Sequence, residues 1–471
     1  MTDPGGALDS AVADLAQRFR AALEPPAHAA VTLDPAVLRA RFDGPLPEQG
    51  RPIEQILEEL ERRSHDGLAG GTGGRYFGYV TGAVLPAAAI VEAWTAAVDQ
   101  NVGMWPLGPA AVELEQVTIG WLADLLGFPS HSGYFGSGAT MANTIALAVA
   151  RHSFGKKHGV DVMQQGVRAL PPLAIYGSEE LHLSDHKALR TLGLGSGCVR
   201  RIPIDERYAM RVDLLLETIH RDRAAGIEPA IVIAQAGSVN TGACDPLAAI
   251  ADVCRDEGLW LHVDGAFGAF YRLWEPAAKL VAGMERADSL AVDAHKWLNV
   301  PNGAGFVLIR DAQLHRETFA GSAAYLTPGA GVNLHELGIE ASRSWRGACV
   351  WAALQQLGRE GVVEMVSRCC ELAQELAGLV EKSEHLELTA PAPTNVVCFR
   401  YRPTGWSDGD ALDELNRRIQ ADVSASRDVF HTGAQLANGF SQRAAVVSWR
   451  TGRSDIRALH DAVEEAGSRL A

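Results

Sequence analysis

One lysine stands where its amine could do chemistry. Lys296 lies in the stretch Asp293-Ala-His-Lys-Trp297, directly after the apolar residues 290–292 and before a turn-rich segment that begins at Asn299. The apolar residues predict a buried strand, and the turn residues predict a loop at its end. A half-buried lysine can attack a carbonyl carbon with its amine. The simpler alternative is a lysine that ends a strand with its ammonium group in solvent.

An aspartate ends a second apolar run. Residues 259–263 predict another buried strand, and Asp264 follows directly. In an open parallel sheet, ligands bind at the carboxyl ends of the strands. A buried carboxylate needs a partner, and pyridoxal phosphate fits both residues, since it uses a lysine for its Schiff base and an acid opposite its ring nitrogen. The simpler alternative for Asp264 is a helix cap or a turn.

Taken together, Asp264-Gly-Ala and Asp293-Ala-His-Lys296 resemble the pyridoxal-phosphate-dependent amino-acid decarboxylases related to aromatic-L-amino-acid and glutamate decarboxylase. The resemblance extends from about Arg75 to the C-terminus. It implies an α/β fold of the aspartate-aminotransferase-like kind (fold type I), in which helices cover a central, mainly parallel sheet. An N-terminal helical segment and a small C-terminal α+β domain complete that fold. It also implies pyridoxal 5'-phosphate as cofactor, bound by Lys296 and its neighbour His295.

A glycine turn precedes a helix predicted at residues 140–151. The free amides and the dipole at such a helix start favour an anion, and the Thr140 hydroxyl adds a donor. Many turns of this kind are only helix caps. The resemblance assigns Gly138, Ala139 and Thr140 to the cofactor phosphate.

His182 and His186 lie one helical turn apart, a spacing that could bind a metal ion. No third ligand follows nearby in the sequence, so we expect no metal. In the resembled family a histidine in the setting Ser-x-x-x-His stacks on the cofactor ring, which assigns His182 to that position. Ala266 would then pack against the other face of the ring. The family often bonds the ring hydroxyl with a threonine, where this sequence has Val239, and Ser238 or Asn240 could replace it.

Three aromatic residues are candidates for the substrate side of the site. By position, the resemblance places Tyr79 and Trp105 in the substrate pocket, although both could equally be core aromatics. In the resembled decarboxylases, a loop past the lysine carries a tyrosine that returns a proton to the carbanion. Tyr325 matches that tyrosine, and relatives that form aldehydes have phenylalanine there. The alternative for Tyr325 is a loop anchor.

The composition limits the classes of function. The chain has 471 residues and a formal net charge of −15, which argues against nucleic acid and anionic membranes as partners. Its seven cysteines lack paired spacing, which indicates reduced thiols in a cytoplasmic protein. We find no signal peptide and no apolar run long enough to span a bilayer.

The pattern of elements predicts three parts. Residues 1–105 form an N-terminal helical segment that, by the resemblance, wraps around a partner subunit. Residues 106–355 form the large cofactor-binding domain, where apolar strands alternate with helical runs, and residues 356–471 form the small C-terminal domain. The resemblance implies a homodimer with shared active sites. Predicted helices include residues 8–23, 53–60, 86–98 and 361–382, and predicted strands include residues 396–401 and 444–449.

The resulting expectation is a pyridoxal-phosphate-dependent carboxy-lyase that converts an L-amino acid to its amine and carbon dioxide. Lys296, Asp264, His182 and Tyr325 would be its catalytic residues. The same lysine and aspartate also serve aldehyde-forming oxidative decarboxylases, carbon–carbon lyases and aminotransferases, which stay as alternatives. A catalytically silent binding protein is a further alternative. A nucleotide-binding Rossmann enzyme is disfavoured because no GxGxxG turn follows a strand. The sequence does not identify the amino-acid substrate.

Overall fold

The computed structural model describes residues 4–130, 132–321 and 331–471. Seven strands of this chain form the central sheet, in the order β1-β7-β6-β5-β4-β2-β3. These strands are β1 (Ser132–Gly136), β2 (Leu173–Ser178), β3 (Val199–Ile202), β4 (Glu228–Gln235), β5 (Trp260–Asp264), β6 (Ser289–Asp293) and β7 (Gly305–Ile309). Strands β6, β5, β4, β2 and β3 run parallel, whereas β7 is antiparallel to both β1 and β6. The predicted mainly parallel sheet is therefore confirmed.

Helices cover both faces of this sheet. The α-helices between residues 86 and 319 are α4 (Pro86–Val98), α5 (Pro109–Leu126), α6 (Ala139–Lys157), α7 (Val162–Gln165), α8 (Leu183–Thr191), α9 (Val212–Ala224), α10 (Leu247–Glu257), α11 (Glu275–Ala278), α12 (Ala294–Trp297) and α13 (Ala312–Phe319). Successive side chains of a strand point to opposite faces. Accordingly, Ile231 and Ile233 of β4 pack with α6, α8 and α13, while Val232 and Ala234 pack with α5, α9 and α10. Because both faces are covered, the central strands β4, β5, β6 and β7 are largely apolar.

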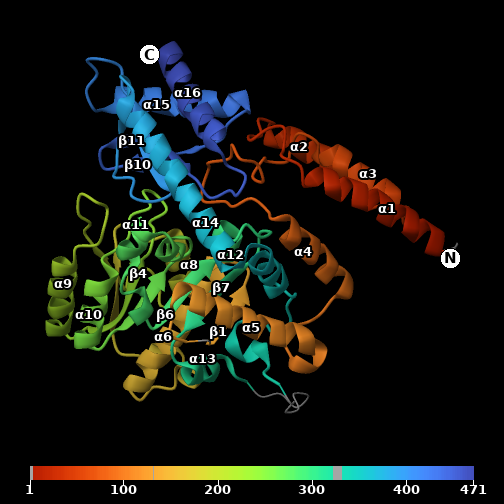
Figure 1. Cartoon of the computed structure of the whole chain (residues 1–471). Coiled ribbons are helices and arrows are strands. Elements are labelled where there is room, and N and C mark those ends of the chain that lie inside the picture. The colour runs from red at the N-terminus through yellow and green to blue at the C-terminus, as the bar shows by residue number, and fades with distance from the viewer. Residues whose placement is uncertain (1–3, 131, 322–330) are drawn as a thin grey trace.

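The C-terminal part contains a second, antiparallel sheet in the order β10-β11-β9-β8. Its strands are β8 (Leu386–Leu388), β9 (Val396–Tyr401), β10 (Thr432–Leu436) and β11 (Gly439–Ala445), and its helices are α15 (Asp410–Ser426) and α16 (Arg453–Leu470). The long helix α14 (Gly347–Lys382) joins it to the large part, as Figure 1 shows, and bends at Gly358, whose φ is 63°. This arrangement confirms the small C-terminal α+β domain.

One strand prediction was partly wrong. Residues 444–449 were expected to form a strand, but β11 ends at Ala445. Beyond it the backbone bonds to groups outside a strand ladder, because Val446 N donates to Asn395 O at 2.9 Å and Trp449 N donates to Asn299 Oδ1 at 3.0 Å. The apolar residues after Ala445 therefore continue beyond the sheet and pack against the loop at Asn299, which follows Lys296.

Three N-terminal helices form an arm, which Figure 1 shows extending away from the rest of the chain. The arm consists of α1 (Pro4–Ala22), α2 (Pro35–Phe42) and α3 (Ile53–Ser64), and an Arg18–Glu61 ion pair joins α1 to α3. Helix α4, although it lies within residues 1–105, packs instead against α14. The division into three domains and the wrapping of a partner stay predictions.

The helices in the described part of the chain include none that is both long and apolar enough to cross a membrane.

Candidate active site

Lys296 lies at the carboxyl end of the large sheet. Strand β6 is fully buried and leads directly into the short helix α12, which carries the lysine. The Lys296 Nζ atom lies 2.8 Å from Asp293 Oδ2 and 5.6 Å from the centre of the Phe267 ring. Its side chain is 18% exposed. The alternative of a lysine that ends a strand with its ammonium group in solvent is therefore wrong.

A segment from the N-terminal part packs tightly over the lysine backbone. A Cβ atom on Gly82 would lie 2.1 Å from the carbonyl oxygen of Lys296, so only glycine fits there. Next to it, Ala83 N donates to Asn299 Oδ1 at 2.8 Å. Residues distant in sequence thus fix the backbone on both sides of the amine.

The start of α6 lies beside the same lysine. Asp293 Oδ1 accepts a hydrogen bond of 2.5 Å from Ala139 N, so one carboxylate joins this helix start to Lys296. Gly138 has a φ of 150°, which favours glycine, and a Cβ there would lie 3.2 Å from Asp293 Oδ1 and 3.3 Å from His295 Cε1. Gly138, Ala139 and His295 therefore lie together, and Thr140 is exposed in the first turn of the helix. A helix start of this kind suits an anion.

Asp264 is held by two donors at the end of β5. Its Oδ2 accepts from Asn143 Nδ2 at 2.9 Å, and its Oδ1 accepts from Ala266 N at 3.0 Å. Asn143 Oδ1 in turn lies 3.0 Å from His262 Nε2, and His262 Nδ1 lies 2.9 Å from Ser289 Oγ. Burial lowers the pKa of His262 to about 4, so its ring is neutral. This network fixes the orientation of the Asp264 carboxyl group.

His182 belongs to the same cluster. It caps α8, because its Nδ1 accepts from Ser184 N at 3.2 Å, and Ser184 Oγ accepts from Asn143 Nδ2 at 3.2 Å. Burial lowers the pKa of His182, and the nearby negative charge of Asp264 opposes this effect. The positive charge of Lys296 also acts on the ring and lowers the pKa further. The structure therefore brings His182, Asp264 and Lys296 together, as the sequence analysis predicted.

The spacing of His182 and His186 does not mark a metal site. The His182 Nδ1 atom already accepts a hydrogen bond from Ser184 N and lies 2.7 Å from Ser184 Oγ. In residues 4–130, 132–321 and 331–471, no group of three or more histidine, cysteine, aspartate or glutamate side chains is placed to hold a metal ion.

The loop between β4 and α10 carries the two residues that could replace the missing threonine. Ser238 Oγ and Asn240 Nδ2 donate to the same Glu180 Oε2 atom, at 3.1 and 2.7 Å. Arg443, on strand β11 of the C-terminal sheet, bonds to this loop, because its Nε donates to Val239 O at 2.6 Å. Its Nη1 donates to Tyr79 O at 2.8 Å. The choice between Ser238 and Asn240 stays open.

The side chains of the predicted substrate residues Tyr79 and Trp105 have other partners in the single chain. The Tyr79 side chain is 61% exposed, and its ring centre lies 6.3 Å from that of Phe430. Trp105 Nε1 donates to Glu113 Oε1 at 2.9 Å, and the ring packs with a separate apolar cluster around Trp345. Tyr325 lies outside the described residues.

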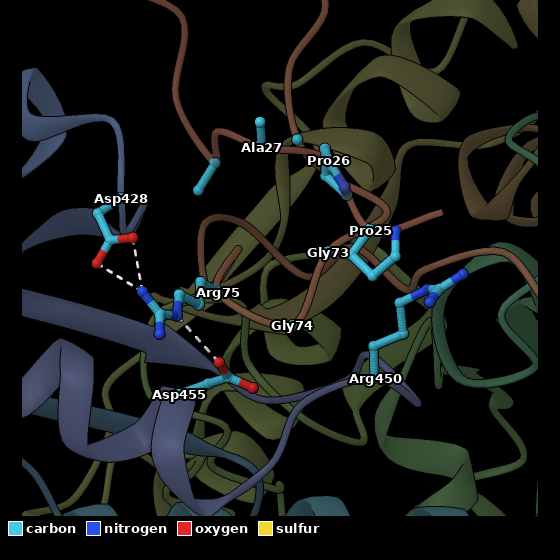
Figure 2. Close-up of a pocket in the computed structure, with 11 residues that line it drawn as sticks. Pro25, Pro26, Ala27, Gly73, Gly74, Arg75, Asp428, Arg450 and Asp455 are labelled. Carbon is cyan, nitrogen blue, oxygen red and sulfur yellow. Dashed lines mark hydrogen bonds and ion pairs between the residues drawn. The ribbon is translucent and has the colours of Figure 1, made fainter. Parts of the chain in front are cut away.

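A cavity of about 300 Å³ lies away from the lysine, between the N-terminal linker and the C-terminal domain (Figure 2). Arg75 enters it and pairs with Asp428 at 2.6 Å and with Asp455 at 3.0 Å. The guanidinium of Arg450 donates to Leu23 O. These contacts join the linker to the C-terminal domain, and none of the predicted site residues lines the cavity, so we place the candidate site at Lys296 instead.

Several polar residues of the cluster were missed by the sequence analysis. Asn143 could have been noticed as an amide in the otherwise alanine-rich, apolar start of a helix. Asp293 stands in the quoted motif three residues before the lysine, and that spacing lets the two side chains meet. Arg443 gave no local signal, because its role depends on a contact between the two sheets.

The residues present fit pyridoxal phosphate. The cofactor needs an amine for its carbonyl carbon, an anion site for its phosphate and an acid for its ring nitrogen. Lys296, the start of α6 and Asp264 offer these three groups around one space at the carboxyl edge of the sheet.

Comparison with known proteins agrees with this chemistry. The profile of the pyridoxal-dependent decarboxylase conserved domain matches residues 35–402. An aromatic-L-amino-acid decarboxylase of Bacillus atrophaeus is 32% identical over 399 residues, covering 83% of this chain and 81% of the relative. A cysteine sulfinic acid decarboxylase of Mus musculus is 31% identical over 392 residues, covering 82% and 78%.

The fold agrees as well. The crystal structure of the mouse protein CSAD superposes with a TM-score of 0.89 at 26% identity, covering 97% of this chain and 99% of that one. The family profile spans well over half of the chain, which identifies the cofactor as pyridoxal phosphate and the enzyme class as carboxy-lyase. This chain belongs to the pyridoxal-dependent decarboxylase family.

Proposed function

We propose that this chain removes the α-carboxylate of an L-amino acid as carbon dioxide and releases the amine, with Lys296 as the residue that binds the cofactor. One observation carries the proposal: Lys296, Asp264 and His182 converge at the carboxyl edge of one sheet, beside the start of α6. The three residues follow three separate strands, and packing of the sheet does not require polar residues at those positions. Their convergence at one edge therefore supports a ligand site.

Each residue has a role that its surroundings support. When bound, pyridoxal phosphate supplies a carbonyl that joins amines and a ring that accepts the electrons of the broken bond. Asp264 would pair with the protonated ring nitrogen, while Asn143 and the Ala266 amide keep the carboxylate in place. Gly138, Ala139 and Thr140 hold the phosphate, with His295 beside them.

The flat faces of the ring need apolar or planar neighbours. His182 stacks as a neutral imidazole, in agreement with its lowered pKa, which follows mainly from burial. Ala266 would pack against the opposite face, where its small side chain would leave room for the ring.

Tyr325 supplies the proton to the α-carbon after carbon dioxide leaves. This role rests on its sequence position, since the residue lies outside the described part of the chain. With Tyr325→Phe in air-saturated buffer we expect aldehyde and ammonia, formed with dioxygen as the oxidant and hydrogen peroxide as its reduced product, to replace part or all of the amine, measured by mass spectrometry of the products. An unchanged amine yield would contradict the role and leave proton delivery to another residue.

The substrate is an amino acid of aromatic or acidic character. The relatives are named for aromatic amino acids and for cysteine sulfinate, and Tyr79 and Trp105 are the pocket residues proposed to read the side chain.

We propose a cytoplasmic homodimer with shared sites, in which the N-terminal segment of residues 1–105 packs on the partner through its arm, helices α1 to α3. Apolar side chains on the arm support this, because Leu15, Phe42, Ile56 and Leu60 are exposed in the single chain. All seven cysteines are free thiols, which supports a reducing compartment. Light scattering of the purified protein tests the dimer, and a monomer that decarboxylates would contradict it.

The central experiment is an assay with added pyridoxal phosphate. The purified protein is incubated with aromatic and acidic L-amino acids, and products are identified by mass spectrometry beside the Lys296→Ala variant. An amine that forms from one substrate and is absent with the variant supports decarboxylation. A keto acid or an aldehyde from the unchanged protein would assign it to one of the alternative reactions, and no turnover with no cofactor binding would leave a silent fold.

A further inference from the structure

A second aspartate is buried beside the site with no ordinary partner. Asp185 lies on α8, three residues after His182, and is 0% exposed. In the described part of the chain, neither carboxyl oxygen accepts a hydrogen bond from another residue. An isolated buried carboxylate costs several kcal/mol, so the group in this position is expected to be neutral.

The group that faces Asp185 is another carboxyl group. Asp264 lies within hydrogen-bonding reach of it, and two carboxylates in such contact cannot both be ionised. Asp264 already accepts from Asn143 Nδ2 and from Ala266 N, whereas neither oxygen of Asp185 has a donor among the described residues. The proton of the pair therefore belongs to Asp185. Burial first, and then the charge of Asp264, raise the pKa of Asp185 well above its ordinary value.

No nearby cation neutralises Asp185 instead. On β5, the facing groups are Asp264 and the neutral His262, and α6 offers the uncharged Asn143. His182, at the start of the same helix, interacts with Asp264, Lys296 and Asp293. Among the described residues, the charge that acts on Asp185 is that of Asp264.

We propose that Asp185 is a positioning residue that keeps its proton at neutral pH and donates it in a hydrogen bond to Asp264. This bond is the third donor on the Asp264 carboxylate, after Asn143 and Ala266. With three donors, the carboxylate is fixed at the end of β5 before any ligand binds. Its use in orienting Asp264 toward the cofactor ring nitrogen rests on the proposed function, whereas the proton on Asp185 is a property of the cofactor-free chain.

The first test measures unfolding by urea between pH 5 and 8 in the cofactor-free protein. Asp185→Asn copies the neutral acid, since its amide can donate to Asp264. The wild-type chain must take up a proton to fold above the ordinary aspartate pKa, and the variant need not. We therefore expect the ratio of folding constants, variant over wild type, to rise by up to about tenfold per pH unit. A ratio that is constant with pH would overturn the proposal.

A matched control is Asp222→Asn. Asp222 is also buried, but its carboxylate accepts from Arg200 Nε at 2.9 Å and from Tyr176 OH at 3.1 Å. This variant should lose stability at every pH, without the rising ratio. Infrared spectra give an independent reading, because the neutral carboxyl band of the wild type at pH 7.5 should be absent from Asp185→Asn. A spectrum identical to the wild type would overturn the proposal.

The second test concerns positioning and uses Asp185→Leu, which removes the donor. We expect pyridoxal phosphate to bind about tenfold more weakly to this variant and with wild-type affinity to Asp185→Asn, measured by absorbance titration. Equal affinity in both variants would overturn the positioning role. If the leucine variant does not fold, the pH ratio and the infrared band of Asp185→Asn still decide. If the wild type binds no cofactor, the proposed function fails while the first test stands.

Discussion

Two ion pairs in this chain each join a basic side chain to a carboxylate, and they differ in how far the protein encloses them. Arg343 and Glu115 meet through two bonds, Nη1–Oε1 at 3.0 Å and Nη2–Oε2 at 2.5 Å, and their side chains are 0% and 2% exposed. Glu115 also accepts from Gly347 N at 2.9 Å, and the guanidinium lies 4.5 Å from the centre of the Tyr134 ring. Lys296 and Asp293 meet through a contact of 2.8 Å, and the lysine side chain is 18% exposed.

The comparison shows that burial of a charge does not by itself mark a functional site. The Arg343–Glu115 pair has little unused bonding capacity, and it joins α5 to the start of α14. The Lys296 amine has donors to spare, and its partner Asp293 also serves the start of α6. The pair that holds the fold is enclosed by protein, with Arg343 Nε left without a partner among the described residues, whereas the pair beside the candidate site keeps a partly exposed lysine side chain.

The largest expected effect follows from removal of the lysine. Lys296→Ala should abolish product formation, because no amine remains to hold the cofactor. Its free energy of unfolding should change by about 1 kcal/mol or less, since the ion pair is single and partly exposed. Lys296→Arg is the matched control, which keeps the charge beside Asp293 but cannot bind a carbonyl carbon. Product formation by either variant would show that the Lys296 amine is not needed for the reaction, and would contradict the functional role given to this ion pair.

The arginine pair should behave in the opposite way. Arg343→Met leaves Glu115 as an uncompensated buried charge and should lower the free energy of unfolding by about 3–5 kcal/mol. Product formed per folded molecule should change little. The double variant Arg343→Met/Glu115→Leu should recover much of the stability, as measured by urea unfolding. A double variant as unstable as the single one would show that the pair does more than compensate charge.

A buried neutral group gives a third, pH-dependent case. Burial lowers the pKa of His431 to about 4, below its value of 6.5 in the unfolded chain. Its contribution to stability is full above pH 6.5 and is lost as the pH falls toward 4, by up to about 3 kcal/mol. Urea unfolding of His431→Leu should show a shallower loss of stability over this range than the wild type. Parallel curves would contradict the assignment.

The smallest effect concerns the backbone under the lysine. Gly82→Ala would bring a Cβ to 2.1 Å from the Lys296 carbonyl oxygen, so the lysine must shift. We expect cofactor affinity to fall about tenfold, equal to about 1.4 kcal/mol. Gly197→Ala is the control, since a Cβ there meets nothing within 4 Å. Equal affinities would mean that the segment around Gly82 moves freely and does not position the amine.

Much of the fold could be predicted because local patterns reflect local physics. Helix α4 lies at the predicted residues 86–98, and β9 at the predicted residues 396–401. Prolines and glycines mark these ends, since they start or stop regular backbone. The strand predicted at residues 444–449 was partly wrong, because an apolar run signals burial and does not tell whether the burying partner is a strand or a loop.

The sequence by itself placed Lys296, Asp264 and His182 after apolar runs, where parallel strands end at a common edge. Only the tertiary structure decided which groups meet there. The contact of Asn143 with Asp264 spans 121 positions, and that of Asp293 with Ala139 spans 154. The sequence gives no sign that Asp185 faces Asp264, because strand order and helix rotation set that contact. Hydrogen-bond partners follow from three-dimensional packing, whereas strand ends follow from local hydrophobic pattern.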